Sequence, residues 1–294
     1  MLIPPLDQVL PDGSVVTEVV PRTGGSLHSV FEVRRAGAEP LVVKRYTDDF
    51  RAKQAKELYV YELLADVGSV PRVVGADLAS GLTAFTMVPG RPMWEHPSSP
   101  ATDRAAYLRI GRFQAALHRI ALPGYGDLAA GVVDPVSDNL TYMRLRFARQ
   151  LAEFRAAGGP VSLHDAVARR VADADHHFAA CTGAVLCHLD LHEGNVLVDD
   201  AGTVTGFIDV ENAQAADPMA DLAKTIQFET SGSAAKRAAL LEGYGPLPPF
   251  GAERIDLYRM FHALELWTWY SSIDHTEPLP ALLEDLRTLS GRPA

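Results

Sequence analysis

The first ninety residues of the chain alternate short apolar runs with turn residues, a pattern that predicts β-strands. These runs are rich in β-branched residues, and we expect strands over residues 14–20, 30–34, 41–46, 72–76 and 83–88. Residues 51–67 instead have helical spacing, with Gly68 as the stop. The N-terminal part is therefore predicted to be a sheet with one helix inserted.

Beyond Pro89-Gly90 the apolar residues recur mostly at helical spacing. We expect helices over residues 101–120, 137–157, 162–181, 233–244 and 252–273. The exception is the stretch 184–210, where short apolar runs are broken by polar turns and a β-hairpin is expected. The pattern predicts an α+β protein with a sheet-rich lobe, residues 1–88, and a larger helical lobe, residues 89–294.

Composition narrows the class of protein. The chain has 294 residues, 47% of them hydrophobic, and a net charge of −10. No apolar run is long enough to cross a membrane. Cys181 and Cys187 have neither disulfide-framework nor metal-site spacing, so we expect a reduced, cytoplasmic protein. The acidic balance disfavours nucleic acid as a partner and suits a cationic small molecule.

The densest polar segment lies between residues 187 and 195. It contains Asp190 and, five residues later, Asn195, while Asp209 ends the next predicted strand. Mg²⁺ prefers oxygen ligands from one or two side chains together with substrate phosphates. A further carboxylate beside such an ion can orient a hydroxyl group and accept its proton. This division of labour is what phosphoryl transfer requires.

The order HxDxxxxN, followed by a strand and IDxE, resembles the catalytic core of the aminoglycoside phosphotransferase and choline kinase superfamily, small-molecule relatives of the protein kinases. The resemblance implies that Asp190 is the catalytic base and that Asn195 and Asp209 bind the metal. His188 would support the catalytic loop. It also implies a bilobal protein-kinase-like fold, with a small antiparallel-sheet N-lobe, a larger helical C-lobe, and ATP with Mg²⁺ as cofactors bound between them.

The segment 216–223 resembles the family's downstream GDPxxDLA motif, which implies that Asp217 and Asp221 buttress the catalytic loop. Leu189 stands where the family usually has glycine, and we expect its side chain to point into the core without loss of activity. No Phe-Gly follows Asp209 and no APE sequence follows later. These absences argue against a protein kinase with an activation loop.

Lys44 ends an apolar strand and resembles the strand lysine that contacts the α- and β-phosphates in kinases. A lysine in apolar surroundings needs a carboxylate partner. The predicted helix over 51–67 offers Glu57 on its apolar face, and Glu62 on a more polar face is the second candidate.

Two loops complete the expected nucleotide site. A turn with Gly24, Gly25 and Ser26 stands where the phosphate-covering loop belongs, and glycine allows backbone N–H groups to approach phosphate closely. Met87 and Val88 belong to a segment that resembles the family's interlobe linker. The resemblance implies that their backbone binds the adenine edge.

The acceptor site is expected on the helical lobe. Glu265 and Trp269, followed by Asp274, offer carboxylates beside aromatic faces, which suit an ammonium group. The alternative, that the aromatic rings belong to the core and the acids to the surface, stays open.

Several acceptors fit the pattern. An aminoglycoside or related antibiotic is the first choice, and an amino sugar, choline, ethanolamine or a homoserine-type compound is the metabolic alternative. A silent nucleotide-binding module is a third hypothesis, which the intact Lys44, Asp190, Asn195 and Asp209 disfavour. The sequence does not predict the oligomeric state.

Two metal motifs can be set aside. His188-x-Asp190 begins like a histidine–carboxylate iron site, but that site needs a strand-dominated barrel and the second half is helical. His192-Glu193 begins like the zinc motif HExxH, but Val196 occupies the position of its second histidine.

Overall fold

The structure is a computed structural model that describes residues 5–22, 29–230 and 233–291. The chain forms two compact units. The first unit comprises Met1–Ser98, Leu128–Gly131 and Glu193–Ala213, and the second comprises Ser99–Asp127, Val132–His192 and Gln214–Ala294. The chain therefore crosses from the second unit to the first inside the polar segment, after Asp190 and before Asn195.

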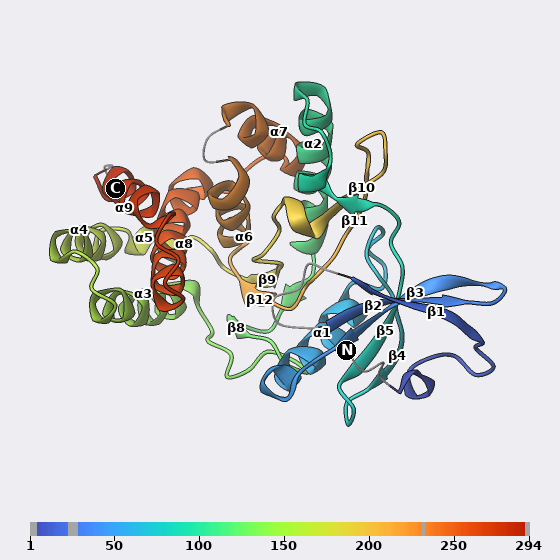
Figure 1. Ribbon diagram of the computed structural model, residues 1–294. Helices are drawn as coiled ribbons and strands as arrows, with labels where there is room; N and C mark the ends of the chain where they lie inside the picture. The colour runs from blue at the N-terminus through green and yellow to red at the C-terminus, as the bar shows by residue number, and fades with distance from the viewer. Residues whose placement is uncertain (1–4, 23–28, 231–232, 292–294) are drawn as a thin grey trace. The chain divides into compact units, whose positions relative to one another are not determined.

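The first unit is built on a five-stranded antiparallel sheet (Figure 1). Its spatial order is β1 (Val16–Arg22), β2 (Ser29–Arg35), β3 (Ala38–Arg45), β5 (Leu82–Thr86) and β4 (Val73–Asp77). Every strand expected in this part of the sequence is present. In the ladder between β3 and β5, Lys44 lies opposite Thr83.

One helix, α1 (Arg51–Leu63), packs on this sheet because its buried residues recur at helical spacing. Gln54 fixes the helix by donating a hydrogen bond of 2.9 Å from its amide nitrogen to the carbonyl oxygen of Leu82 on β5. The same face brings Glu57 into the interior. Glu62 lies exposed on the opposite face.

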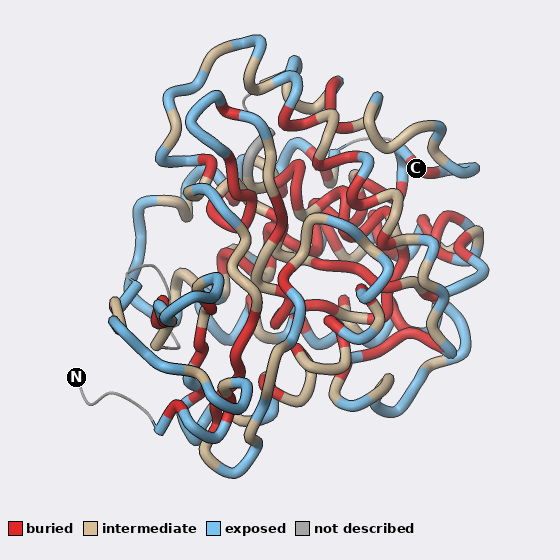
Figure 2. Tube along the Cα trace, turned by 90° about the vertical axis from the view of Figure 1, so that its right-hand side faces the viewer, coloured by how far each residue is buried: buried red, intermediate tan, exposed pale blue. Residues whose placement is uncertain are grey.

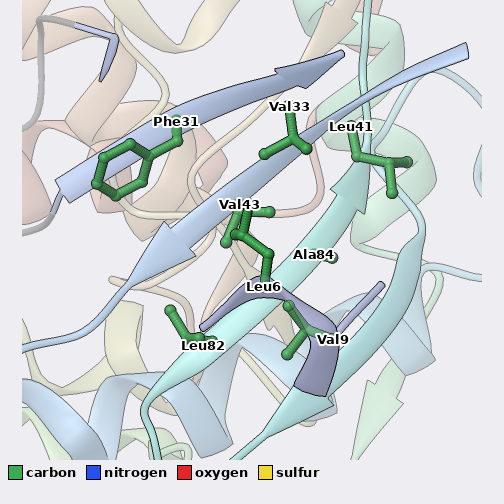
Figure 3. Packing of buried hydrophobic residues seen from close by; sticks show 8 residues of the cluster. All are labelled: Leu6, Val9, Phe31, Val33, Leu41, Val43, Leu82 and Ala84. Atoms are coloured by element: carbon green, nitrogen blue, oxygen red, sulfur yellow. The ribbon is translucent and has the colours of Figure 1, made fainter. Parts of the chain in front are cut away.

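The hydrophobic core of the sheet follows from strand alternation, since every second side chain points to one face. The cluster shown in Figure 3 takes pairs of alternate residues from three strands and adds two residues from the N-terminal segment around η1 (Leu6–Gln8). Its members are Leu6, Val9, Phe31, Val33, Leu41, Val43, Leu82 and Ala84. This core supports β3 one residue before Lys44.

The first unit also contains a short three-stranded sheet, in the order β11 (Val204–Phe207), β10 (Val196–Val198) and β6 (Arg91–Pro92). Strands β10 and β11 form the hairpin that the sequence predicts. Short 3₁₀ turns accompany these elements: η2 (Asp48–Phe50), η3 (Met93–Glu95) and η4 (Glu193–Asn195).

The second unit is mainly helical. Its helices are α2 (Pro100–Leu117), α3 (Asn139–Ala156), α4 (Val161–Ala172), α5 (Asp175–Ala179), α6 (Pro218–Thr225), α7 (Ala234–Tyr244), α8 (Gly251–Ser272) and α9 (Leu279–Ser290), with a π-helical turn, η5 (Ile226–Thr230), after α6. A small antiparallel sheet has the order β7 (Ala121–Leu122), β9 (Ala184–Cys187), β12 (Gln214–Ala216) and β8 (Gly126–Asp127).

Helix α8 forms the centre of this unit and packs against α3, α6 and α9 (Figure 1). It is buried on most of its circumference, which agrees with its apolar sequence. Figure 2 colours the whole chain by burial and shows the buried residues concentrated in strands and central helices. None of the helices in the described residues is apolar over a length that could cross a membrane.

The fold class expected from the sequence is confirmed, with three differences in detail. The single helix expected over residues 162–181 is two helices, α4 and α5, because the chain turns at Asp173 and Ala174. Helices α6 and α9 and the strands of two or three residues outside the hairpin (β6, β7, β8 and β12) were not expected. These strands have too few residues to show a period.

The core position Leu41 tests the packing of the first unit. We expect Leu41→Ala to lower the free energy of unfolding by about 2–5 kcal/mol, because the side chain is buried and its removal leaves a cavity. The matched variant Leu78→Ala removes a leucine that is 58% exposed and should change stability by no more than about 0.5 kcal/mol. Urea unfolding followed by circular dichroism measures both, and equal effects would contradict the assignment of the core.

Candidate functional site

Lys44 is the centre of a buried ion-pair network in the first unit. Its Nζ lies 3.0 Å from Glu57 Oε2 on α1, 3.2 Å from Asp209 Oδ1 and 2.8 Å from Glu211 Oε2. Burial lowers the pKa of Lys44, but the three carboxylates outweigh burial and hold that pKa above its ordinary value. The ammonium is therefore charged at all physiological pH values.

Glu57 is the most deeply buried member of this network. It accepts a hydrogen bond from the Tyr46 hydroxyl in addition to its ion pair with Lys44. Burial raises the pKa of Glu57 to about 7, against the opposing attraction of Lys44. This carboxylate therefore changes its charge near neutral pH.

Glu211 is a functional candidate that the sequence reasoning did not select. Its two carboxylate oxygens bind different lysines: Oε2 accepts from Lys44, and Oε1 accepts from Lys53 on α1 at 2.7 Å. Burial raises the pKa of Glu211, but Lys44 and Lys53 lower it to about 2. The signal that could have found it was the acid two residues after Asp209 in the IDxE motif.

Asn195 and Asp209 are brought together by the hairpin of β10 and β11. Val196 pairs with Phe207, and the backbone N–H of Ile208 donates to the carbonyl oxygen of Asn195 at 3.0 Å. Asn195 is buried, whereas the Asp209 side chain is 37% exposed. An amide and an accessible carboxylate at one end of a hairpin are oxygen donors of the kind that Mg²⁺ takes. The residues present therefore fit a magnesium site.

Asp209 adopts a left-handed backbone conformation, with φ of 65°. This region is uncommon for residues other than glycine, although aspartate tolerates it better than most. Asp209 lies two residues after the end of β11 and two residues before Glu211. Both acids can thereby contact Lys44 although only one residue separates them.

The loop with His188 and Asp190 lies in the second unit, directly after β9. His188 is buried and Asp190 is partly exposed. Asp221, on α6, accepts hydrogen bonds from the backbone N–H groups of His188 at 2.9 Å and Leu189 at 2.8 Å. The carboxylate of Asp221 thus fixes the backbone immediately before Asp190.

Asp221 is itself held by a histidine from a distant part of the chain. Its Oδ2 lies 3.1 Å from Nε2 of His118, and the other ring nitrogen of that histidine lies 3.0 Å from the Tyr244 hydroxyl. Burial raises the pKa of Asp221, but the hydrogen bond from His118 and nearby positive charge lower it below its ordinary value. Asp221 therefore remains a carboxylate, the form that accepts both backbone hydrogen bonds.

Asp217 begins α6 as its N-cap and accepts from the backbone N–H of Met219 at 2.9 Å. Its second oxygen accepts from the Tyr258 hydroxyl at 2.9 Å and lies 3.2 Å from Nε of Arg254, both on α8. Asn139 of α3 also donates to it. Burial raises the pKa of Asp217, although Arg254 opposes this. One carboxylate thus joins three helices at the start of α6.

The expectation for Leu189 was wrong. Its side chain is only partly buried, and the neighbouring apolar residue that enters the core is Leu191. The backbone of Leu189 is left-handed, with φ of 57°, because Asp221 draws its N–H inward. Leucine pays about 1–2 kcal/mol for this conformation, which glycine adopts freely.

The sequence also predicts nucleotide contacts from a glycine turn and from the segment after β5. Gly24, Gly25 and Ser26 lie outside the described residues. Met87 and Val88 come directly after β5 and are half-buried.

The three residues proposed for the acceptor lie on α8 and just after it. Glu265, on α8, accepts from Arg146 Nη2 at 3.0 Å and lies 3.6 Å from Lys224 Nζ. Trp269 is exposed, with its ring tilted against that of Tyr270 and the centroids 4.8 Å apart, and Asp274 lies beyond the end of α8. Burial raises the pKa of Glu265, but Lys224, His262 and Arg146 lower it to about 2. Two basic side chains therefore meet the negative charge of Glu265.

One further cluster in the described residues has metal-ligand chemistry, formed by His118, Cys187 and Asp221. Asp221 already uses both oxygens for the loop and His118, and the Cys187 thiol lies 3.6 Å from the Asp217 carbonyl oxygen. Burial raises the pKa of Cys187 well above its ordinary value, so the thiolate that binds metals is disfavoured. These residues form a structural hydrogen-bond network.

The sequence over residues 18–258 matches the model of the phosphotransferase enzyme family. No curated protein matches the chain. Among solved structures, it is similar to a fructosamine-3-kinase-like protein from Thermobifida fusca, with 23% identity, a TM-score of 0.70, and coverage of 97% of this chain and 96% of that one.

Two further structures share the fold. A thermostable mutant of aminoglycoside phosphotransferase APH(4)-Ia, in a ternary complex with AMP-PNP and hygromycin B, has 17% identity and a TM-score of 0.73, with 94% of each chain covered. A macrolide 2'-phosphotransferase type I has 19% identity and a TM-score of 0.65, covering 93% of this chain and 92% of that one. Because the family match spans most of the sequence and the fold agrees, the chain belongs to the phosphotransferase enzyme family.

Proposed function

We propose that this kinase transfers the γ-phosphoryl group of ATP to a hydroxyl group of a small molecule, with Asp190 as catalytic base. Lys44, held by Glu57, contacts the phosphates of ATP, and Asn195 and Asp209 hold Mg²⁺. The observation that carries the proposal is the position of Lys44, whose ammonium lies 3.0 Å from Glu57 and 3.2 Å from Asp209. One cation thus joins the helix acid to the proposed metal ligand.

The role of Lys44 follows from its surroundings. A buried ammonium loses hydration, and only close opposite charges restore that loss. When the phosphates of ATP arrive, they can replace Asp209 as partners of the ammonium, because Asp209 is the one partly exposed acid of the three. Asp209 would then be available to bind Mg²⁺. A bound metal ion neutralises charge on the phosphates.

Asp190 follows the backbone that Asp221 fixes, and it precedes Asn195 by five residues. A carboxylate at this point can accept a hydrogen bond from the acceptor hydroxyl and aim its oxygen at the γ-phosphorus. Because little deprotonation precedes a loose transition state, ordinary carboxylate basicity is sufficient for this step. The hydroxyl proton passes to Asp190 as the new P–O bond forms and the bond between the γ-phosphorus and the β,γ-bridging oxygen breaks, which releases ADP.

The acceptor is a small molecule, as it is for the similar APH(4)-Ia structure, which was crystallised with hygromycin B. Aminoglycosides and related aminated antibiotics are the first candidates from the family and from the net charge of −10. Amino sugars, choline, ethanolamine and homoserine-type compounds are the alternatives. ATP consumption with a panel of these compounds tests the proposal: acceptor-dependent turnover supports it, and nucleotide binding without any turnover would make the chain a silent module.

Asp190→Asn should reduce kcat by about 100-fold to 10,000-fold, because it removes the base but keeps the size of the side chain. ATP affinity, measured by isothermal titration calorimetry, should remain unchanged. The matched control Asp165→Asn replaces an exposed aspartate on α4 and should leave both quantities as they were. Full turnover by Asp190→Asn would refute the proposed role.

Asp209→Ala should abolish the part of ATP affinity that depends on Mg²⁺. Titrations with Mg²⁺ and with EDTA should then give the same weak binding, whereas the unaltered protein should bind more tightly with the metal. Asp200→Ala, in the exposed turn of the same hairpin, is the control and should keep the difference. A metal dependence that survives in Asp209→Ala would move the metal site elsewhere.

Glu57 predicts a pH dependence of nucleotide binding. Because its pKa is raised to about 7, Glu57 is charged above this pH and neutral below it. Protonation removes a partner that fixes Lys44, so the affinity for MgATP should fall as the pH decreases through about 7.

The variant Glu57→Gln should bind MgATP about tenfold more weakly at high pH and lose most of this dependence. Glu62→Gln, on the exposed face of the same helix, should behave like the unaltered protein. Calorimetric titration at several pH values measures both variants. An identical pH profile for Glu57→Gln and the unaltered protein would exclude Glu57 as its origin.

A further inference from the structure

Two basic side chains converge on Glu265 in the second unit. Arg146 comes from α3, Lys224 from α6 and Glu265 from α8. His262, also on α8, lies with its Nδ1 3.0 Å from the second oxygen of Glu265. Burial lowers the pKa of His262, so this imidazole adds no charge at neutral pH. We call Arg146, Lys224, His262 and Glu265 the Glu265 cluster.

Arg146 is fully engaged within this cluster. Its Nη1 donates to the Tyr142 hydroxyl at 3.0 Å and to Gln214 Oε1 at 3.3 Å, while Nη2 donates to Glu265 at 3.0 Å. The guanidinium also lies over the Phe261 ring, 5.1 Å from its centroid. Arg146 therefore provides a charged hydrogen-bond donor for the Glu265 carboxylate, and its other contacts hold the guanidinium in place.

Lys224 is in a different situation. Its side chain is 12% exposed, and its Nζ lies 3.6 Å from Glu265, beyond hydrogen-bond distance. The ammonium lies over the Phe228 ring, 5.1 Å from the centroid. Among the described residues it donates no hydrogen bond, so three N–H donors remain for a ligand.

The position of Lys224 links it to the catalytic loop. It follows Asp221 by three residues on α6, and Asp221 binds the backbone of His188 and Leu189. The Phe228 ring, which Lys224 covers, also contacts the His192 ring, with 5.9 Å between their centroids. His192 follows Asp190 by two residues, so a continuous set of contacts joins Lys224 to the loop of the proposed base.

The charges of the cluster select the class of acceptor. Arg146 and Lys224 contribute two positive charges and Glu265 one negative charge, which leaves one positive charge unmatched. Asp127 also acts on Arg146, but it is exposed, where solvent screens its charge. An acceptor carboxylate would match this surplus, whereas an acceptor whose only charged group is an ammonium would be repelled by Lys224.

We infer that Lys224 binds a carboxylate of the acceptor, and that the kinase therefore acts on a hydroxylated carboxylic acid. The inference rests on the proposed function, in which Asp190 receives the acceptor hydroxyl. It selects the homoserine-type acceptor, a hydroxy amino acid, over the aminoglycosides, amino sugars and amino alcohols. Glu265 holds Arg146 and sets the position of Lys224, and it does not contact the acceptor.

The test compares each acid with its own amide, which differs only in the carboxylate, and with cationic compounds. ATP consumption is measured with L-homoserine, L-serine and D-glucuronate, with the corresponding amides, and with choline and hygromycin B as cationic compounds. We expect turnover with at least one acid, at a kcat/KM at least tenfold above that of its amide. Turnover of amides or cations equal to that of the acids would overturn the inference, as would turnover of no acid.

Variants of Lys224 connect the preference to this side chain. Lys224→Gln should raise KM for the acid about ten- to hundredfold with little effect on kcat, and it should leave the amide unaffected. Lys224→Arg should retain most of the preference. Lys236→Gln is the matched control, since Lys236 also lies over a ring, that of Tyr107, and 3.7 Å from an acid, Asp103. An unchanged preference in Lys224→Gln would also refute the inference.

The two proposals fail in different ways. If no compound of any charge class supports turnover while ATP still binds, the proposed function fails. If only amines or neutral compounds are phosphorylated, the proposed function stands and the assignment of Lys224 alone is wrong.

Discussion

The buried charge of Lys44 is the constraint on which the first unit depends. An ammonium in the interior is stable only with close acids, and here the acids come from α1 and from the segment after β11. Removing one partner of such a pair typically costs about 3–5 kcal/mol, because it leaves an unmatched buried charge. The sheet, the helix and the hairpin must therefore keep their relative positions to keep Lys44 neutralised. The same requirement arranges the groups that phosphate and metal would use.

The second unit also depends on a buried charged group, which here is the carboxylate of Asp221. Asp221 accepts hydrogen bonds from the backbone N–H groups of His188 and Leu189 and from the ring of His118. The cost appears in the left-handed backbone of Leu189, which a side chain makes less favourable than glycine would be. Residues in sparsely populated conformations persist only where surrounding contacts determine them, as they do here.

Much of this architecture could be predicted from the sequence, because it depends on local periodicity and on motifs of fixed spacing. The strands that surround Lys44 alternate clearly, and α1 places Glu57 where its apolar face predicts. The contacts that escaped prediction join distant residues. His118 reaches Asp221 across 103 residues, and Arg146 reaches Glu265 across 119. No local pattern indicates such partners, and an acid read alone, such as Glu265, is easily taken for a free one.

Glu211 shows the boundary between these cases. The sequence displays it in the motif with Asp209, so its presence was known, but its link to Lys53 depends on the packing of α1. Leu189 shows another boundary, since its backbone angle follows from hydrogen bonds to Asp221 and not from its own preference. In both cases the residue type is visible in the sequence, but its contacts or backbone conformation are determined by residues that pack against it in the fold.

Helix α6 combines two duties on adjacent turns. Its Asp221 is confined by three hydrogen-bond donors, whereas Lys224, one turn later, takes no part in that network. A substitution at position 224 would thus change the side chain that we infer binds the acceptor, while the hydrogen bonds of Asp221 stay intact. One helix would thereby hold the loop with one side chain and set the charge presented to the acceptor with another, so that the two properties can change independently.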